Sequence, residues 1–286
     1  MIYGLIAAVG WGFADFFGAL SGRRIGSLPA VLVGQLLSAV VVSVVLVVAG
    51  DGLGALDDVV VLVFVNGVAA MAAYATHYHA LQLGPVAVVS PIGAGYAVVG
   101  VLLAIVILGE RPSPLALGGM AVTVVGTMLV STDLPALRAR IHERAPGLWW
   151  SVGSAVGFGV AGFILGWIVQ ETHDWVAALW ASRFSMLVAF VPLAIARRRE
   201  LDRLRGAVGL GVVFGLLAGA ADILGVATYS IGAERGDVSI VLASSAVFPL
   251  IAVVASFVWL HERLVMNQYA GVGLVVVGLA LLGLGS

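Results

Sequence analysis

The sequence predicts an all-α polytopic membrane protein with ten transmembrane helices, arranged as two inverted five-helix repeats. Its 286 residues are 62% hydrophobic and only 10% charged, with a mean hydropathy of +1.14. About a quarter of the residues in soluble domains are charged, so this composition excludes a water-soluble fold. Long apolar stretches alternate with short polar connections along the chain, and the second half of the sequence repeats the pattern of the first.

The clearest internal repeat joins residues 84–111 with residues 236–263. The two stretches align without gaps at an offset of 152, and nine of the 28 positions are identical. The match continues into the next apolar stretch, where Gly119 corresponds to Gly271 and Gly126 to Gly278. Repetition over this length indicates a chain built from two copies of one unit.

Ten apolar stretches have the length of a membrane-spanning helix, which needs about 20 residues. They are residues 2–20, 29–50, 59–80, 86–108, 115–131, 148–169, 175–196, 208–231, 238–259 and 267–285. Backbone polar groups have no water partner in lipid, so each stretch is expected to be helical. The first stretch is predicted to be a membrane helix and no signal peptide, because it lacks a basic start and a cleavage site.

A polar connection at residues 132–147 separates two predicted domains, residues 1–145 and 146–286. The first helices of these halves also match, residues 8–14 with residues 155–161, at an offset of 147. Five crossings per half is an odd number, so the second copy enters the membrane from the opposite side. Such inverted repeats are a common transporter design.

Arginine placement predicts the orientation of the chain. Eleven arginines lie in connections after odd-numbered stretches and two lie after even-numbered ones, and the chain has no lysine. Positive residues favour the cytoplasmic side, so both termini are expected outside. Exclusive use of arginine suggests a bacterial source, and we therefore expect a multi-pass protein of the bacterial inner membrane.

The whole chain resembles the drug/metabolite transporter superfamily, in its bacterial EamA-type branch. The resemblance rests on the ten predicted helices, the two repeats, the Trp11-Gly12 start, and the Gly-Glu-Arg and His-Glu-Arg sequences that end at Arg111 and Arg263. It implies secondary transport of a small metabolite, often export, without an ATP site. It does not name the substrate, and it assigns no role to carboxylates within the helices.

Ionisable groups within a bilayer are costly, and each is a candidate functional residue. Asp15 lies in the middle of the first helix and shares a face with Trp11, four residues earlier. A carboxylate beside an aromatic ring suits a cation. The alternative is an ion pair between Asp15 and either Arg23 or Arg24.

Asp222 lies near the middle of the eighth helix, and Tyr229 follows it two turns later on the same face. The equivalent position in the third helix is Ala70, so this carboxylate belongs to one half only. Arg183 in the seventh helix either binds a substrate carboxylate, which suits its planar fork, or neutralises Asp222. The sequence leaves both possibilities open, and an ion pair would favour a zwitterionic substrate.

The remaining candidates are aromatic and polar groups. Tyr74, His77 and Tyr78 share one face of the third helix, where the histidine could relay a proton and where an interfacial belt is the alternative. Helix breaks at Pro91 and Pro249 predict site-lining roles for Ser90, Tyr96 and Ser245, with an ordinary proline kink as the alternative. Helix–helix hydrogen bonding is expected for Gln35 and Asn66, and a helix-end interaction for Glu110.

These patterns predict a secondary active exporter of an amino acid, a small amine or a zwitterion, working by alternating access through a central cavity. Two carboxylates in one cavity cannot both stay ionised cheaply, so proton coupling is expected. The alternatives are an intramembrane enzyme and a scaffold that transports nothing. The expected partners are a small-molecule substrate and the lipid bilayer, with a monomeric or homodimeric state. Without nucleotide-binding motifs or metal-ligand spacing, and at a net charge of −1, no cofactor, metal or nucleic acid is expected.

Overall fold

The computed structural model describes residues 1–50, 52–83, 92–135, 147–202, 204, 209–260 and 265–286, and the regular secondary structure in these ranges is helical. Eight of the described helices are long and apolar enough to cross a membrane. They are α1 (Ile2–Ile25), α2 (Ser27–Ala49), α3 (Val60–Leu83), α6 (Pro114–Ser131), α8 (Leu148–Thr172), α9 (Trp175–Ala196), α11 (Leu210–Arg235) and α14 (Met266–Gly285). A 3-10 turn, η1 (Gly54–Val59), leads into α3.

The fourth and ninth predicted spans take the form of shorter helices. The described part of the fourth contains α5 (Tyr96–Ile107), and the ninth consists of α12 (Val238–Ser245) and α13 (Phe248–Leu260). The break between α12 and α13 covers residues 246–247, and Pro249 is the second residue of α13. Proline has no N–H and disfavours helical geometry in the residue before it, so it is tolerated only in the first turn of α13. A fourth short helix, α10 (Arg198–Leu201), follows α9.

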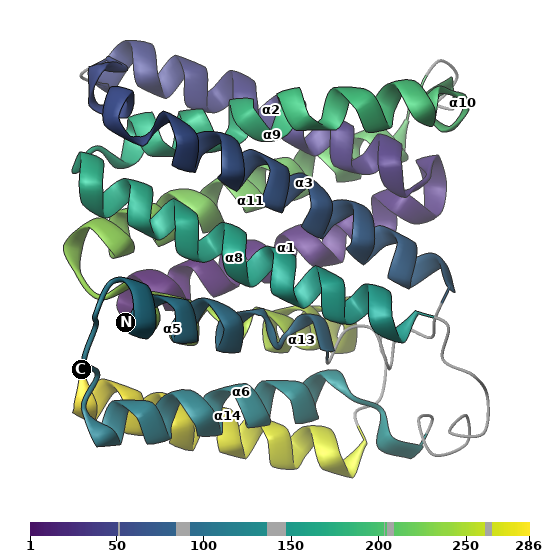
Figure 1. Cartoon of the computed structure of the whole chain (residues 1–286). Coiled ribbons are helices and arrows are strands. Elements are labelled where there is room, and N and C mark those ends of the chain that lie inside the picture. The colour runs from purple at the N-terminus through teal and green to yellow at the C-terminus, as the bar shows by residue number, and fades with distance from the viewer. Residues whose placement is uncertain (51, 84–91, 136–146, 203, 205–208, 261–264) are drawn as a thin grey trace.

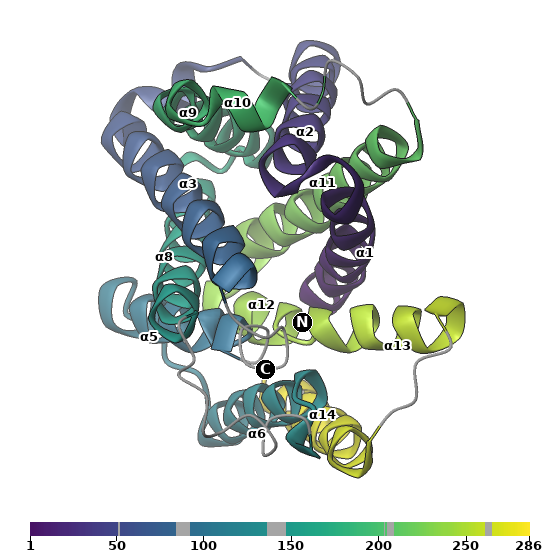
Figure 2. The same ribbon diagram turned by 90° about the vertical axis from the view of Figure 1, so that its right-hand side faces the viewer.

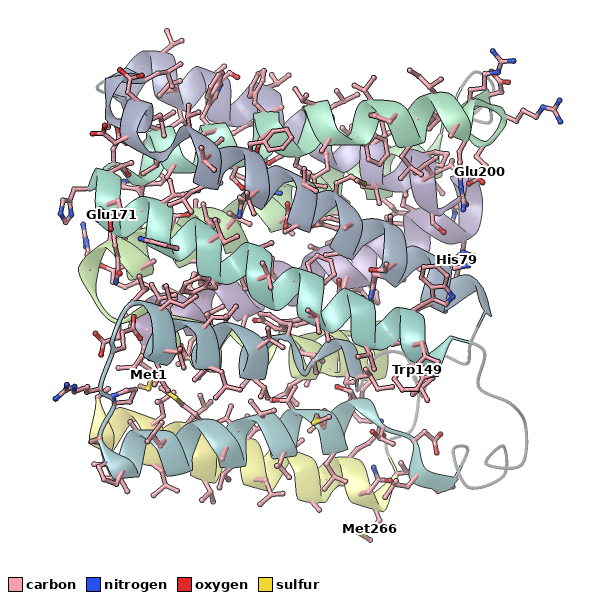
Figure 3. All side chains as sticks on the ribbon, viewed as in Figure 1. Met1, His79, Trp149, Glu171, Glu200 and Met266 are labelled. Atoms are coloured by element: carbon pink, nitrogen blue, oxygen red, sulfur yellow. The ribbon has the colours of Figure 1, made fainter. Side chains whose placement is uncertain are left out.

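The two halves of the chain run in opposite directions. Both termini lie at one end of the helix bundle (Figure 1), which we call the terminal end. Figure 3 places Met1 and Glu171 at this end, and Trp149 and Glu200 at the other. Helix α1 therefore leaves the terminal end while its equivalent, α8, runs towards it. We call the opposite end, where Arg197 to Arg199 precede Glu200, the arginine-rich end.

Helix contacts between the halves have equivalents in which the two halves change places. Helix α1 packs along α11, the equivalent helices α8 and α3 pack along each other, and α6 packs along its own counterpart α14. A Cβ atom on Gly10 would lie 2.5 Å from the nitrogen of Gly225, and one on Gly157 would lie 2.8 Å from the Cβ of Ala73. The offsets of 147 and 152 convert the first pair into the second, so the repeats read from the sequence are repeats in space.

Two groups of three helices face each other across the bundle (Figure 2). We call α1, α2 and α11 the first arm, and α3, α8 and α9 the second arm. Each arm takes two helices from one half and one helix from the other. The α6–α14 pair lies below α5 and α13 in the view of Figure 1, and it packs on α12 and α13, which in turn pack on the first arm. Helices from both halves therefore meet at the centre of the molecule.

Glu110 ties the first half to the second at α12. Its two carboxylate oxygens accept hydrogen bonds from the backbone N–H groups of Val238 and Ser239, at 2.6 and 2.9 Å. These N–H groups have no partner within the helix, and a negative charge is favourable at a helix N-terminus. The helix-end interaction expected for Glu110 is thus a cap on a helix of the other half.

Candidate functional site

A buried ion pair joins the two arms halfway along their helices. Arg183 of α9 and Asp222 of α11 approach to 2.9 Å between Nη2 and Oδ2, and their side chains are 6% and 12% exposed. Such a pair is costly to bury, and removing either partner leaves an uncompensated charge. Of the two roles that the sequence left open for Arg183, the structure has the pairing with Asp222.

The guanidinium of Arg183 also binds α2. Its Nη1 donates a hydrogen bond of 3.0 Å to Oε1 of Gln35, which is itself buried. The Nε atom of Arg183 is buried without a hydrogen-bond partner in the described residues, and the contact of Nη2 with Asp222 is close without being aligned as a hydrogen bond. Gln35 performs the helix–helix role expected of it, and its partner is the central charge.

Asn66 also makes the helix–helix bonds expected of it. Its Nδ2 donates to the backbone oxygen of Ala161 at 2.7 Å, and its Oδ1 accepts from the hydroxyl of Ser182 at 2.7 Å. These bonds join α3, α8 and α9 within the second arm. Asn66 therefore fixes the shape of that arm around Arg183, the residue after Ser182.

Asp15 lies in the middle of α1 with its side chain exposed. It is close enough to Asp222 and to Tyr96 for an electrostatic interaction with each, which places it on the inner side of α1. Among the described residues it has neither a hydrogen bond nor an ion pair. The alternative pairing with Arg23 or Arg24 is not observed among the described residues, and Arg24 instead donates to the backbone of Leu20 and lies over the ring of Phe214.

Aromatic side chains from both halves surround this region. The ring of Trp11 lies on the backbone of Gly225, and its centroid is 5.8 Å from that of Tyr229. The hydroxyl of Tyr229 donates to the backbone oxygen of Gly162 at 2.7 Å. The hydroxyl of Tyr96 and that of Ser245 share a hydrogen bond of 2.9 Å that joins the fourth span to the ninth.

The candidates on α3 lie apart from the central charges, against α8. Tyr74 and His77 both contact the ring of Phe158, with centroid distances of 5.0 and 5.9 Å, and the Nδ1 of His77 is 3.2 Å from the hydroxyl of Ser154. The predicted shared face of Tyr74 and His77 is therefore present. The side chain of Tyr78 and the whole of Ser90 lie outside the described residues.

A small pocket opens nearer the arginine-rich end and does not reach the central charges. Tyr74 lies on its wall, between α2 and α9. Its lining residues are Ser27, Leu28, Val31, Tyr74, Ala75, His79, Phe190, Leu193, Arg197 and Glu200. The pocket therefore does not include Arg183, Asp222 or Asp15. The candidate site is defined by these central charges and the aromatic side chains near them.

The central residues together offer one negative charge among aromatic rings. The charge of Arg183 offsets that of Asp222, and Asp15 has no counter-ion among the described residues. Trp11, Tyr96 and Tyr229 add ring faces and hydroxyl groups to this region. Ring faces attract cations, most strongly where water is excluded, so the arrangement suits a small cationic group.

The model of the EamA-like transporter family matches residues 1–132 and 145–284, nearly the whole chain. The chain belongs to the EamA-like transporter family. It is accordingly a multi-pass membrane transporter of small solutes, and the resemblance seen in the sequence is confirmed. Proteins of this family are transporters rather than enzymes. The two stretches of the match correspond to the two repeats.

The transporter also resembles solved structures, of which 29 chains match. One of them, titled "Crystal structure of protein", superposes with a TM-score of 0.75 and 19% sequence identity, over 99% of this chain and 96% of that chain. At this identity the likeness concerns the fold alone. A search of curated proteins gave no match.

Proposed function

We propose that the transporter is a secondary active exporter of small metabolites that carry an amine, such as amino acids, in the bacterial inner membrane. In this proposal ten segments cross the membrane, and substrate binds at the centre between the two arms. The observation that carries the proposal is Asp15, a carboxylate in mid-span that has no ion pair among the described residues and lies within electrostatic reach of Asp222 and of Tyr96.

Asp15 binds the substrate amine and, in its absence, a proton. A carboxylate in a low-dielectric site does not stay ionised without a partner, so an amine and a proton compete for it. Each proton that enters then displaces an amine, which couples a proton gradient to export. The Nε of Arg183, which has no hydrogen-bond partner among the described residues, suits the carboxylate of an amino acid.

The test is flux through the purified transporter in liposomes, with an imposed proton gradient and a pool of labelled amines and amino acids. Asp15→Asn keeps the size of the side chain but removes its charge and its titration. We expect gradient-driven flux of the transported amine to fall by two orders of magnitude or more. Glu171→Gln, at the terminal end, is the control and should transport normally.

Undiminished gradient-driven flux in Asp15→Asn would contradict the role of this carboxylate. A substrate without an amine would contradict the assigned class while leaving secondary transport intact. The enzyme and scaffold alternatives predict that no compound in the pool crosses the membrane at all. The assay therefore separates transport from both alternatives.

A further inference from the structure

The two arms do not contact each other symmetrically. Helix α11 of the first arm packs against both α8 and α9 of the second arm. Its equivalent, α3 of the second arm, makes no comparable packing with α1 or α2 in the described part of the chain. The α1–α11 and α8–α3 contacts correspond to each other in the two halves. The contacts of α11 with α8 and α9 have no comparable counterpart among the described residues, so the two halves differ here.

One hydrogen bond between the arms shows where the two halves differ. Tyr229 of α11 donates to the backbone oxygen of Gly162 in α8. The offsets of 152 and 147 relate Tyr229 to His77 and Gly162 to Asp15. Tyr229 is 1% exposed, whereas His77 is only half-buried and Asp15 is exposed. The arms are therefore closed at the Tyr229 contact and separated at the equivalent position on α1 and α3.

Within each arm, the corresponding contacts are alike. The rings of Trp11 and Tyr229 are 5.8 Å apart within the first arm, and the equivalent rings of Phe158 and His77 are 5.9 Å apart within the second. At these ring contacts the two arms are alike, whereas at the Tyr229–Gly162 contact between the arms they differ. Rigid bodies that differ only in their mutual packing are suited to pivot about each other.

We propose that His77 binds Asp15 in the opposite arrangement of the two arms, in which this asymmetry is exchanged. The proposal rests on the proposed function, since alternating access requires a second arrangement. Tyr229 then leaves Gly162, the terminal end opens, and α1 closes on α3 at the arginine-rich end. An imidazole N–H donates a strong hydrogen bond to a carboxylate.

In this proposal, His77 contacts the substrate-binding carboxylate only in the opposite arrangement of the arms. In the present arrangement Asp15 is exposed and available to an amine. In the opposite arrangement the imidazole donates a hydrogen bond to the same carboxylate, which weakens its hold on the amine while the terminal end is open. The predicted orientation puts that end outside the cell, so the exchange releases substrate in the direction of export.

The exchange can be followed by distances between α1 and α8 at both ends. The chain has no cysteine, so pairs of cysteine-linked spin labels report only the chosen positions. The arginine-rich end is monitored by Arg23 and Trp149, and the terminal end by Ile2 and Glu171, all of them exposed. Pulsed electron paramagnetic resonance in lipid nanodiscs without substrate gives each distance distribution.

A larger side chain at the terminal end should shift the arms to the opposite arrangement. A Cβ atom on Gly166 would lie 2.7 Å from Cγ1 of Val238 and 2.9 Å from the hydroxyl of Tyr229, so Gly166→Leu cannot keep this contact closed. We expect the Ile2–Glu171 distance to lengthen and the Arg23–Trp149 distance to shorten together. Gly18→Leu is the control, because nothing lies within 4 Å of a Cβ there, and it should change neither distance.

The role of His77 is tested in the Gly166→Leu background. His77→Ala should reduce the ratio of the exchanged to the present arrangement roughly tenfold, the effect of losing one hydrogen bond to a charged group. His79→Ala is the matched control, since His79 packs on Trp150, and it should leave the ratio unchanged. If Gly166→Leu does not fold, Tyr229→Phe removes the hydrogen bond to Gly162 and should shift both distances in the same directions.

Distances that change at one end only, or that fail to move in the folded variant, would overturn the exchange. Equal effects of His77→Ala and His79→Ala would overturn the assignment of His77. The distances are measured without substrate, so they are independent of the flux assay. Coupled distances without any amine flux would reject the proposed function and leave the exchange standing.

Discussion

Arg183 uses separate atoms of its guanidinium to hold Gln35 on α2 and Asp222 on α11. Its position in α9 places a positive charge where all three helices meet, and its side chain is almost fully buried. Such a residue needs its counter-charge for stability. Asp15 has no ion pair among the described residues, so its carboxylate is available for another role.

Replacing Asp222 by asparagine should therefore destabilise the transporter more than the same change at Asp15. Removing one partner of a buried ion pair typically costs about 3–5 kcal/mol, whereas Asp15→Asn breaks no ion pair in the described structure. Thermal unfolding in detergent compares the two variants directly. Equal melting temperatures for Asp222→Asn and Asp15→Asn would show that the pair contributes little to stability.

At the scale of the helices, close packing depends on small residues where backbones meet. In lipid, helices gain little from apolar burial and associate through close van der Waals contact instead. Helices α6 and α14 illustrate this at two equivalent positions. A Cβ atom on Gly119 would lie 2.8 Å from the oxygen of Gly278, and one on Gly271 would lie 2.8 Å from the oxygen of Gly126.

Gly119→Ala should separate α6 from α14 and lower the melting temperature. Overpacking of this kind typically costs about 1–3 kcal/mol. The neighbouring Gly118 is the matched control, because a Cβ atom there would meet nothing within 4 Å, and alanine favours a helix over glycine. We expect Gly118→Ala to be neutral or stabilising, and a similar loss in both variants would contradict the packing argument.

At the scale of the whole molecule, three consecutive arginines lie together at one end of the bundle. The α9–α10 junction at this end carries Arg197, Arg198 and Arg199, while both termini lie at the other end (Figure 1). Positive residues favour the cytoplasmic side. The transporter should therefore be inserted with the terminal end outside the cell.

Cysteine labelling tests this orientation, since the natural chain has no cysteine to interfere. Glu171 and Glu200 lie at opposite ends (Figure 3). A membrane-impermeant maleimide added to intact cells should label Glu171→Cys and not Glu200→Cys. Inside-out vesicles should give the reverse pattern. Labelling of Glu200→Cys in intact cells would invert the predicted topology.

The sequence by itself determined the membrane class, the two repeats and their offsets. Hydropathy, helix length and repetition are properties of consecutive residues, so they can be read without knowing which helices touch. The Gly10–Gly225 and Gly157–Ala73 contacts confirm both offsets. The first helix extended further than predicted, to Ile25, because arginines at a helix C-terminus are stabilised by its dipole.

Only the tertiary structure decided what each central side chain binds. The sequence left Arg183 with two possible partners, and the residues that surround it are far apart in the chain: Gln35 is 148 residues away. It also could not show that α11 crosses between the arms while its equivalent α3 does not. The partners of Arg183 and the position of α11 both depend on how helices that are distant in sequence pack together. A single hydrogen bond or the absence of a Cβ atom can determine which helix faces come into contact.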